Sequence, residues 1–109
     1  MIEQKKHQYE YAVLVGIINQ EQSAQQLSDY MDELAFLTLT AGGKVLKRFT
    51  QKLETPHPKT FIGSGKMEDV QAYVKTHDIS TVVFDDELTP AQQSNIEELL
   101  KCKILDRTG

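Results

Sequence analysis

The sequence of 109 residues has a single cysteine, Cys102, and no tryptophan. One cysteine cannot form a disulfide within the chain, so nothing argues for secretion, and a reducing cytosol is the expected compartment. No apolar run approaches the roughly 20 residues that span a bilayer. The polar N-terminus, residues 1–8, lacks the apolar stretch of a signal peptide. We therefore expect a cytoplasmic protein without a membrane segment.

Metal ligands and catalytic groups are also scarce. The three histidines, His7, His57 and His77, lie far apart in the sequence and show no metal-ligand spacing. Cys102 has no histidine in a plausible partner position, which favours a partly buried, inert thiol. No Ser-His-Asp or Cys-His arrangement can be assembled from the other residues. We therefore expect no catalytic residue, no metal and no cofactor in this stretch of chain.

The composition fits one small soluble domain. A chain of 109 residues suits a single hydrophobic core. The contents of 39% hydrophobic and 26% charged residues are close to those of an ordinary soluble domain. We predict a flexible N-terminal arm over residues 1–9 and one α/β domain over residues 10–109.

The net charge of −4 conceals an uneven distribution. The segment between residues 44 and 66 has one acid, Glu54, and a charge of +5, whereas the rest of the chain has a charge of −9. Such asymmetry can mark a binding surface for an anionic partner. It is also typical of a solvated edge strand whose lysines prevent aggregation, and the charges alone favour that second reading. The basic residues are Lys44, Lys47, Arg48, Lys52, Lys59 and Lys66.

The first half of the domain is predicted to be a strand, a helix and a strand. Residues 11–18 form an apolar run rich in β-branched residues, typical of a strand buried on both faces. Ser23 and Gln26 form a capping box that starts a helix, and Gly42 and Gly43 are expected to end it. Residues 45–53 mix apolar and basic residues, which predicts an edge strand. The apolar stripe of the helix consists of Leu27, Tyr30, Met31, Leu34, Ala35 and Thr38.

The second half is predicted to continue as helix, strand, helix and strand. A helix follows residues 63–66, and the short apolar runs 81–84 and 103–105 are predicted to be strands. Thr89 caps the last helix, with Pro90 at its first position and Gln92 completing a second capping box. The apolar faces of these two helices consist of Met67, Val70, Tyr73 and Val74, and of Ile96, Leu99 and Leu100.

This alternation predicts a three-layer αβα fold with a four-stranded parallel sheet and right-handed crossovers. The two most apolar strands, the first and the third, should be central, which gives the strand order 2-1-3-4. The sequence ends directly after the last strand, without the helix that would complete the layer. We therefore expect a fragment of a longer protein.

The stretch Gly63-Ser64-Gly65-Lys66 is the most informative local pattern. Two glycines bring backbone close to a ligand, and the N–H groups that start the next helix can bind an anion. A phosphate-binding P-loop reads G-x-x-x-x-G-K-[ST], but Thr60 and Met67 stand where that pattern needs its first glycine and its hydroxyl. Nucleotide hydrolysis at this loop is therefore not expected. A tight turn that needs glycine for its backbone dihedrals is the alternative reading.

The acidic run Asp85-Asp86-Glu87 follows the predicted third strand, at the side of an open sheet where ligands usually bind. Three acids could hold a divalent cation, or they could charge the first turn of the helix that begins near Thr89. A phospho-receiver domain also has an aspartate after its third strand. That domain, however, needs acids after its first strand and a lysine after a fifth strand, and this chain has neither. We favour the helix-capping role.

Three separated motifs together resemble the N-terminal domain of HflX-type GTPases. They are residues 58–66, residues 85–97 and Asp106-Arg107-Thr108-Gly109, and their order and spacing follow the family pattern from about residue 43 onward. The resemblance implies an α/β domain that precedes a helical linker and a GTP-binding domain. GTP and Mg²⁺ would bind in that later domain, beyond Gly109.

The resemblance also implies partners. Proteins of this family are GTPases that bind the large ribosomal subunit and split stalled ribosomes, and their N-terminal domain and linker approach ribosomal RNA. On that basis the basic segment is expected to neutralise RNA phosphates. There are two alternatives. One is a regulatory ATP site at the stretch Gly63-Ser64-Gly65-Lys66, which we call the glycine loop, and the other is a domain that restrains the GTPase domain in cis. The expected RNA- or anion-binding residues are Lys47, Arg48, Lys52, Lys59, Gly63, Ser64, Gly65 and Lys66.

Overall fold

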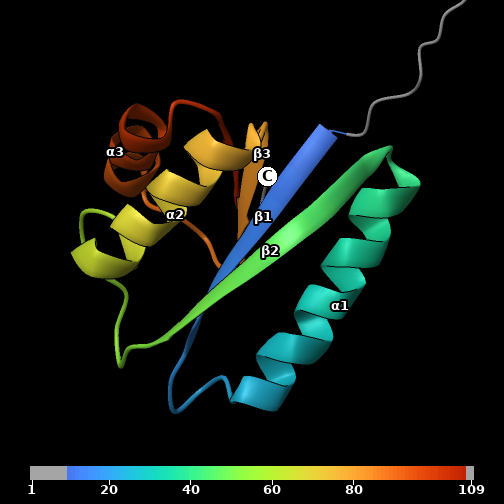
Figure 1. Cartoon of the computed structure of the whole chain (residues 1–109). Helices are drawn as coiled ribbons and strands as arrows, with labels where there is room; N and C mark the ends of the chain where they lie inside the picture. Colours follow the sequence, from blue (N-terminus) through green and yellow to red (C-terminus); the bar gives the residue numbers. More distant parts are fainter. Residues whose placement is uncertain (1–9, 108–109) are drawn as a thin grey trace, which may run out of the picture.

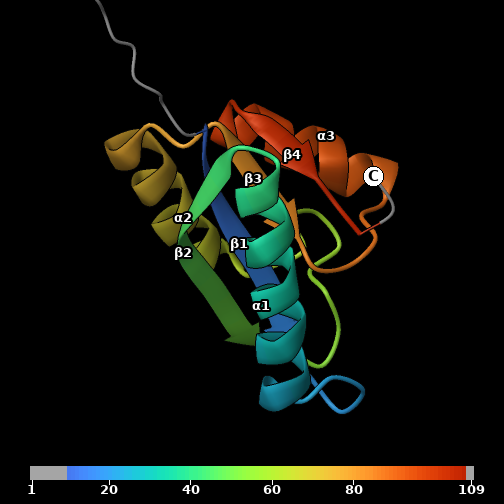
Figure 2. The same ribbon diagram turned by 90° about the vertical axis from the view of Figure 1, so that its right-hand side faces the viewer.

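The computed structural model describes residues 10–107, so the predicted arm over residues 1–9 lies outside the described residues, as do residues 108–109. Helix α1 covers one face of the sheet, and α2 and α3 cover the other (Figures 1 and 2). The predicted three-layer α/β architecture is confirmed. The elements are β1 (Glu10–Ile18), α1 (Ala24–Thr40), β2 (Gly43–Lys52), α2 (Ser64–His77), β3 (Thr81–Phe84), α3 (Pro90–Leu100) and β4 (Lys103–Leu105).

The sheet has four parallel strands in the order β2-β1-β3-β4, as predicted. Strand β1 is central and pairs with β2 over its whole length, from Glu10 opposite Gly43 to Ile18 opposite Lys52. A register shift between Ala12 and Val13 adds one residue to β2 at this point. Strand β2 lies at the edge of the sheet, which confirms the position expected from its basic residues.

The strand β1 divides the core into two parts, because its alternate side chains point to opposite faces. Val13, Val15 and Ile17 belong to the larger core, beneath α2 and α3. Leu14 belongs to the smaller core, which Leu27 and Met31 of α1 complete. Continuous burial of β1 therefore follows from helices on both faces, as expected for a parallel sheet.

The helix starts are built as the sequence predicts. Ser23 and Thr89 each accept a hydrogen bond from the backbone of a glutamine three residues later, and that glutamine side chain accepts one in return. The end of α1 differs slightly, because Ala41 is the C-cap and Gly43 already belongs to β2. Gly42, between them, has a φ of +95°, the left-handed region that favours glycine.

One predicted core residue is wrong. Leu99 is 38% exposed, whereas Ile96 and Leu100 of the same helix are buried. The buried face of α3 runs through Gln92, Ile96 and Leu100 at a constant spacing of four residues, and Leu99 lies beside that line. Among the helices of residues 10–107, none is long and apolar enough to cross a membrane.

Two glycines provide a matched test of the packing. A Cβ at Gly16 would lie 2.6 Å from Cδ1 of the buried Leu27, so we expect Gly16→Ala to lower the free energy of unfolding by about 1–3 kcal/mol through overpacking. Apart from its two chain neighbours and the backbone of its own helix, a Cβ at Gly65 would meet no atom of residues 10–107 within 4 Å. Gly65→Ala, within a helix, should be neutral or stabilising by up to about 1 kcal/mol. Urea denaturation measures both, and equal effects would contradict this packing of α1 on β1.

Candidate functional site

The glycine loop forms the start of α2. Gly63 is the N-cap residue, and its N–H donates a hydrogen bond to Oε1 of Gln51 on β2, at 2.8 Å. Gly63 and Gly65 have ordinary negative φ values, since Gly42 is the one described glycine with a positive φ. The reading of this loop as a tight turn that needs glycine for its dihedrals is therefore wrong. Instead, Gly63 lies close to Gln51, and a side chain at Gly65 would point into open space.

The first turn of α2 is open to solvent. Ser64 and Gly65 are exposed, and a glycine N-cap has no side chain with which to bond the amides that follow. The first amides of a helix have no partner within the helix, and the helix dipole is positive there. This turn can accept an anion, and Lys66 adds a full positive charge beside it.

Lys66 also lines a groove between the edge strand β2 and helix α2. The groove has a volume of about 600 Å³. Lys47 lines it from β2, and its Nζ lies 5.6 Å from the ring centroid of Phe49. Asp69 is the one acid among the described lining residues. We call this hollow the β2–α2 groove; its lining residues are Lys47, Arg48, Phe49, Thr50, Lys66, Asp69, Ala72, Tyr73, Thr76 and His77.

Aromatic rings form one end of the β2–α2 groove. The ring of Tyr73 lies edge-to-face with Phe49, at a centroid distance of 5.8 Å, and stacks on the imidazole of His77, at 3.9 Å. The hydroxyl of Tyr73 donates a hydrogen bond to the carbonyl oxygen of Leu46 on β2, at 3.4 Å. Basic and aromatic groups therefore line the same hollow, a combination typical of nucleic-acid-binding surfaces.

The remaining basic residues of the candidate set are placed elsewhere. Arg48 forms a 2.8 Å ion pair with Asp32 of α1, so its side chain extends over the opposite face of the sheet. Lys52, four residues further along the strand, lies on that same face and is exposed. The structure brings Lys47 and Lys66 together in the β2–α2 groove. Arg48 also lines this groove, but its guanidinium is paired with Asp32 on the opposite face, and Lys52 does not line it.

Lys59 lies on a turn that helix α3 fixes in place. His57 and Phe61 form an isolated antiparallel bridge, and Phe61 is fully buried with a φ of 70°. Gln92 donates a hydrogen bond from Nε2 to the carbonyl oxygen of His57, and Asn95 donates one from Nδ2 to that of Lys59. The motif over residues 58–66 thus holds an exposed lysine on a rigid turn before the glycine loop.

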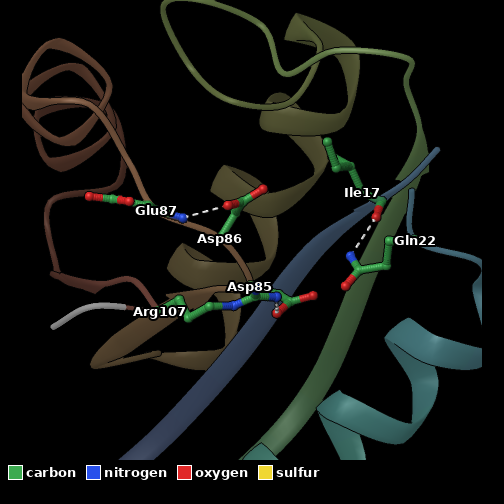
Figure 3. Close-up of polar contacts among 6 residues, drawn as sticks. All are labelled: Ile17, Gln22, Asp85, Asp86, Glu87 and Arg107. Carbon is green, nitrogen blue, oxygen red and sulfur yellow. Dashed lines mark hydrogen bonds and ion pairs between the residues drawn. The ribbon is translucent and has the colours of Figure 1, made fainter. Parts of the chain in front are cut away.

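The acidic run after β3 does not cap α3, so that prediction is wrong. Thr89 and Gln92 cap this helix, which begins only at Pro90. Asp85 is instead 1% exposed, and its Oδ1 lies 2.6 Å from Nη2 of Arg107 (Figure 3). This carboxylate raises the pKa of Arg107, chiefly through the hydrogen bond. The buried charge of Asp85 explains why the partner must be a cation.

The same three acids do not form a metal site. Their side chains point in different directions, and the carboxylate of Asp86 accepts a hydrogen bond from the backbone N–H of Glu87 at 2.7 Å (Figure 3). Within residues 10–107 no group of three or more histidine, cysteine or acidic residues could hold a metal ion. His7 lies outside that range. Cys102 is half-buried, and burial raises the pKa of its thiol.

Two features of the site are not evident from the local sequence. Tyr73 and His77 have the i, i+4 spacing of a helical pair. That His77 lines a groove follows only from the position of β2 beside α2, which the local sequence does not show. Asp85 and Arg107 each belong to a motif that the sequence singles out, yet nothing local connects residues 22 positions apart. The guanidinium of Arg107 also lies 4.8 Å from the ring of Tyr30 in α1.

Two ion pairs of different burial allow a direct comparison. Arg107→Ala leaves the buried carboxylate of Asp85 without its cation, so we expect a loss of about 2 kcal/mol in the free energy of unfolding. Arg48→Ala removes a pair whose side chains are 36% and 65% exposed, and should cost less than about 1 kcal/mol. Thermal or urea unfolding measures both. Equal costs would contradict the buried role of Asp85.

The thiol of Cys102 provides a second test. A raised pKa keeps the thiol protonated, and the thiolate is the reactive form. At pH 8 we expect Cys102 in the folded chain to react with a thiol reagent at least several-fold more slowly than after unfolding in urea. Reaction at the rate of the unfolded chain would contradict the burial of this side chain.

Comparison with known proteins extends these observations. A family described as GTP-binding GTPase N-terminal matches residues 28–109. The GTPase HflX of Flavobacterium psychrophilum is 56% identical over 108 residues, which cover 99% of this chain and 26% of that protein. The GTPase HflX of Escherichia coli is 39% identical over 101 residues, 92% of this chain and 23% of that protein. The chain spans about a quarter of the length of these curated relatives.

Proposed function

Because this chain belongs to the GTP-binding GTPase N-terminal family, as the N-terminal domain of an HflX GTPase, we propose that it binds ribosomal RNA of the large ribosomal subunit. The proposed contacts are the β2–α2 groove, the open start of α2 and the turn that carries Lys59. The whole protein would be a GTPase with its GTP and Mg²⁺ sites outside these 109 residues, and the domain would also contact its own linker and GTP-binding domain.

The observation that carries this proposal is the pairing of Lys47 and Lys66 across one groove. Lysine amino groups on an exposed surface contact phosphates without reading the base sequence, and they release counterions when they bind. The proposal therefore assigns the main phosphate contacts of the basic segment to Lys47 and Lys66, which line the same groove. Arg48 and Lys52 contribute less, since Arg48 is already paired with Asp32.

A regulatory ATP site is the second candidate. It is favoured by the glycine-capped start of α2, where exposed amides can bind a phosphate group beside Lys66. Calorimetry with millimolar ATP tests it. Gly65→Val, which places a branched side chain in the open space beside the first turn, where the phosphate would bind, should abolish the heat. A third role, restraint of the GTPase domain in cis, predicts a changed GTPase rate when residues 1–109 are removed from the whole protein.

Charge reversal in the groove is the principal test. We expect Lys47→Glu with Lys66→Glu to weaken binding to purified large subunits by roughly tenfold or more and to lower the slope of log K against log salt by about two. The matched control is Lys75→Glu with Lys101→Glu, which has the same net charge but alters a separate hollow between α2 and α3. Co-sedimentation over a range of salt concentrations measures both. Equal weakening by the two pairs would contradict a role for the groove.

A gain-of-function variant complements this test. Asp69 lines the groove beside the two lysines, so its carboxylate opposes phosphate binding. Asp69→Asn keeps the shape of the side chain and removes the charge, and we expect it to strengthen binding by a few-fold at low salt, with a smaller gain at high salt. Unchanged affinity for large subunits would show that this groove is not the contact surface.

A further inference from the structure

We infer that the stacked pair of His77 and Tyr73 is a platform for an unpaired RNA base, with the lysines of the same groove binding the flanking phosphates. This inference rests on the proposed function, and it specifies single-stranded RNA as the segment that the β2–α2 groove accepts. It follows from the position of an exposed aromatic stack next to basic side chains.

The stack is held firmly by its own helix and by β2. Tyr73 and His77 are four residues apart, so their side chains lie on the same face of α2. The Nδ1 atom of His77 is 3.2 Å from the carbonyl oxygen of Tyr73. That oxygen can only accept, so Nδ1 donates and the orientation of the imidazole is fixed. On the other side, Phe49 and the carbonyl oxygen of Leu46 hold the phenol ring of Tyr73. A pre-ordered platform loses little entropy when a base stacks on it.

The residues of this aromatic cluster differ in burial, which distinguishes the rings that pack in the core from the ring that can bind a base. Phe49 is 8% exposed and belongs to the core, and Tyr73 is partly buried against that core. His77 is exposed and lies at the outer end of the cluster, with its inner face on Tyr73. Its outer face is therefore available to a planar ligand.

The charges beside the platform fit a nucleotide strand. Lys47 lies at the aromatic end of the groove, since its Nζ is 5.6 Å from the ring centroid of Phe49. Lys66 lies eleven residues before His77 in α2, about 16 Å away along the helix axis. A strand along the groove would thus place phosphates near both lysines while one base rests on His77. In a duplex, neighbouring base pairs cover both faces of each internal base, so an internal base of a duplex cannot stack on this platform.

The experiment uses the 109-residue chain and compares two substitutions of His77, one that removes the aromatic ring and one that keeps it. The probe is a ten-nucleotide RNA with 2-aminopurine at its centre, an adenine analogue whose fluorescence falls when it stacks. The same strand annealed to its complement provides the duplex, and ATP tests the isolated nucleotide. The variants are His77→Ala and His77→Phe, and circular dichroism checks that each is folded.

We expect the single strand to bind with quenching of 2-aminopurine. His77→Ala should weaken this binding by about tenfold and abolish the quenching, while the salt dependence stays the same because both lysines remain. His77→Phe, which keeps an aromatic ring, should retain the affinity and the quenching. The duplex should bind more weakly and should not respond to His77→Ala.

Other results separate this inference from the function on which it rests. If RNA binds and Lys47→Glu with Lys66→Glu weakens it, but His77→Ala has no effect, the base platform is refuted and the proposed RNA contact stands. Tighter binding of the duplex than of the single strand would likewise refute the base platform and leave the proposed RNA contact standing. The chain could instead bind ATP but not RNA, and lose ATP binding on His77→Ala. This result would show that the groove accepts a single nucleotide and would refute the inference. Absence of binding to both RNA and large subunits would refute the inference and the proposed function together.

Discussion

Burial of β1 on both faces is the constraint on which the other elements depend. Residues 12–17 are at most 3% exposed where the side chains are hydrophobic, and β1 pairs with both of its neighbours in the sheet. A strand with two buried faces requires a helical layer on each side, which α1 provides on one face and α2 with α3 on the other. Gly16 shows how tight this arrangement is, because the side chain of Leu27 occupies the space where its Cβ would lie.

The candidate site is a consequence of this topology. With β1 and β3 at the centre, β2 is an edge strand, and no other strand within residues 10–107 pairs with its outer side. Helix α2 covers the core side of β2 only in part, which leaves the β2–α2 groove between them. An edge strand also favours charged side chains, so the lysines that protect the edge are the ones that a polyanion would meet. Of the two groove lysines, Lys47 belongs to this edge strand and Lys66 to α2.

The elements that local patterns encode could be predicted from the sequence, and those that depend on distant contacts could not. Two capping boxes predicted the starts of α1 and α3, and the apolar character of β1 and β3 predicted the strand order. The predicted burial of Leu99 was wrong. The buried face of α3 follows a four-residue spacing, and the packing of this helix against the sheet decides which face that is. The predicted role of Asp85 was wrong because its partner, Arg107, follows α3 and β4 in the sequence, 22 residues away. The groove was not foreseen, because it needs the register of β2 beside α2.

The most direct test of the central claim is a chemical-shift map of the isotopically labelled 109-residue chain during titration with single-stranded RNA. If the β2–α2 groove is the contact surface, the amides of Lys47, Phe49, Lys66, Tyr73 and His77 will shift together and with one affinity. The amides around Asp32 in α1, and those of Leu99, Leu100 and Lys101 in the hollow between α2 and α3, will shift little. A set of shifts centred on either of those two surfaces, with the groove unaffected, would contradict the account.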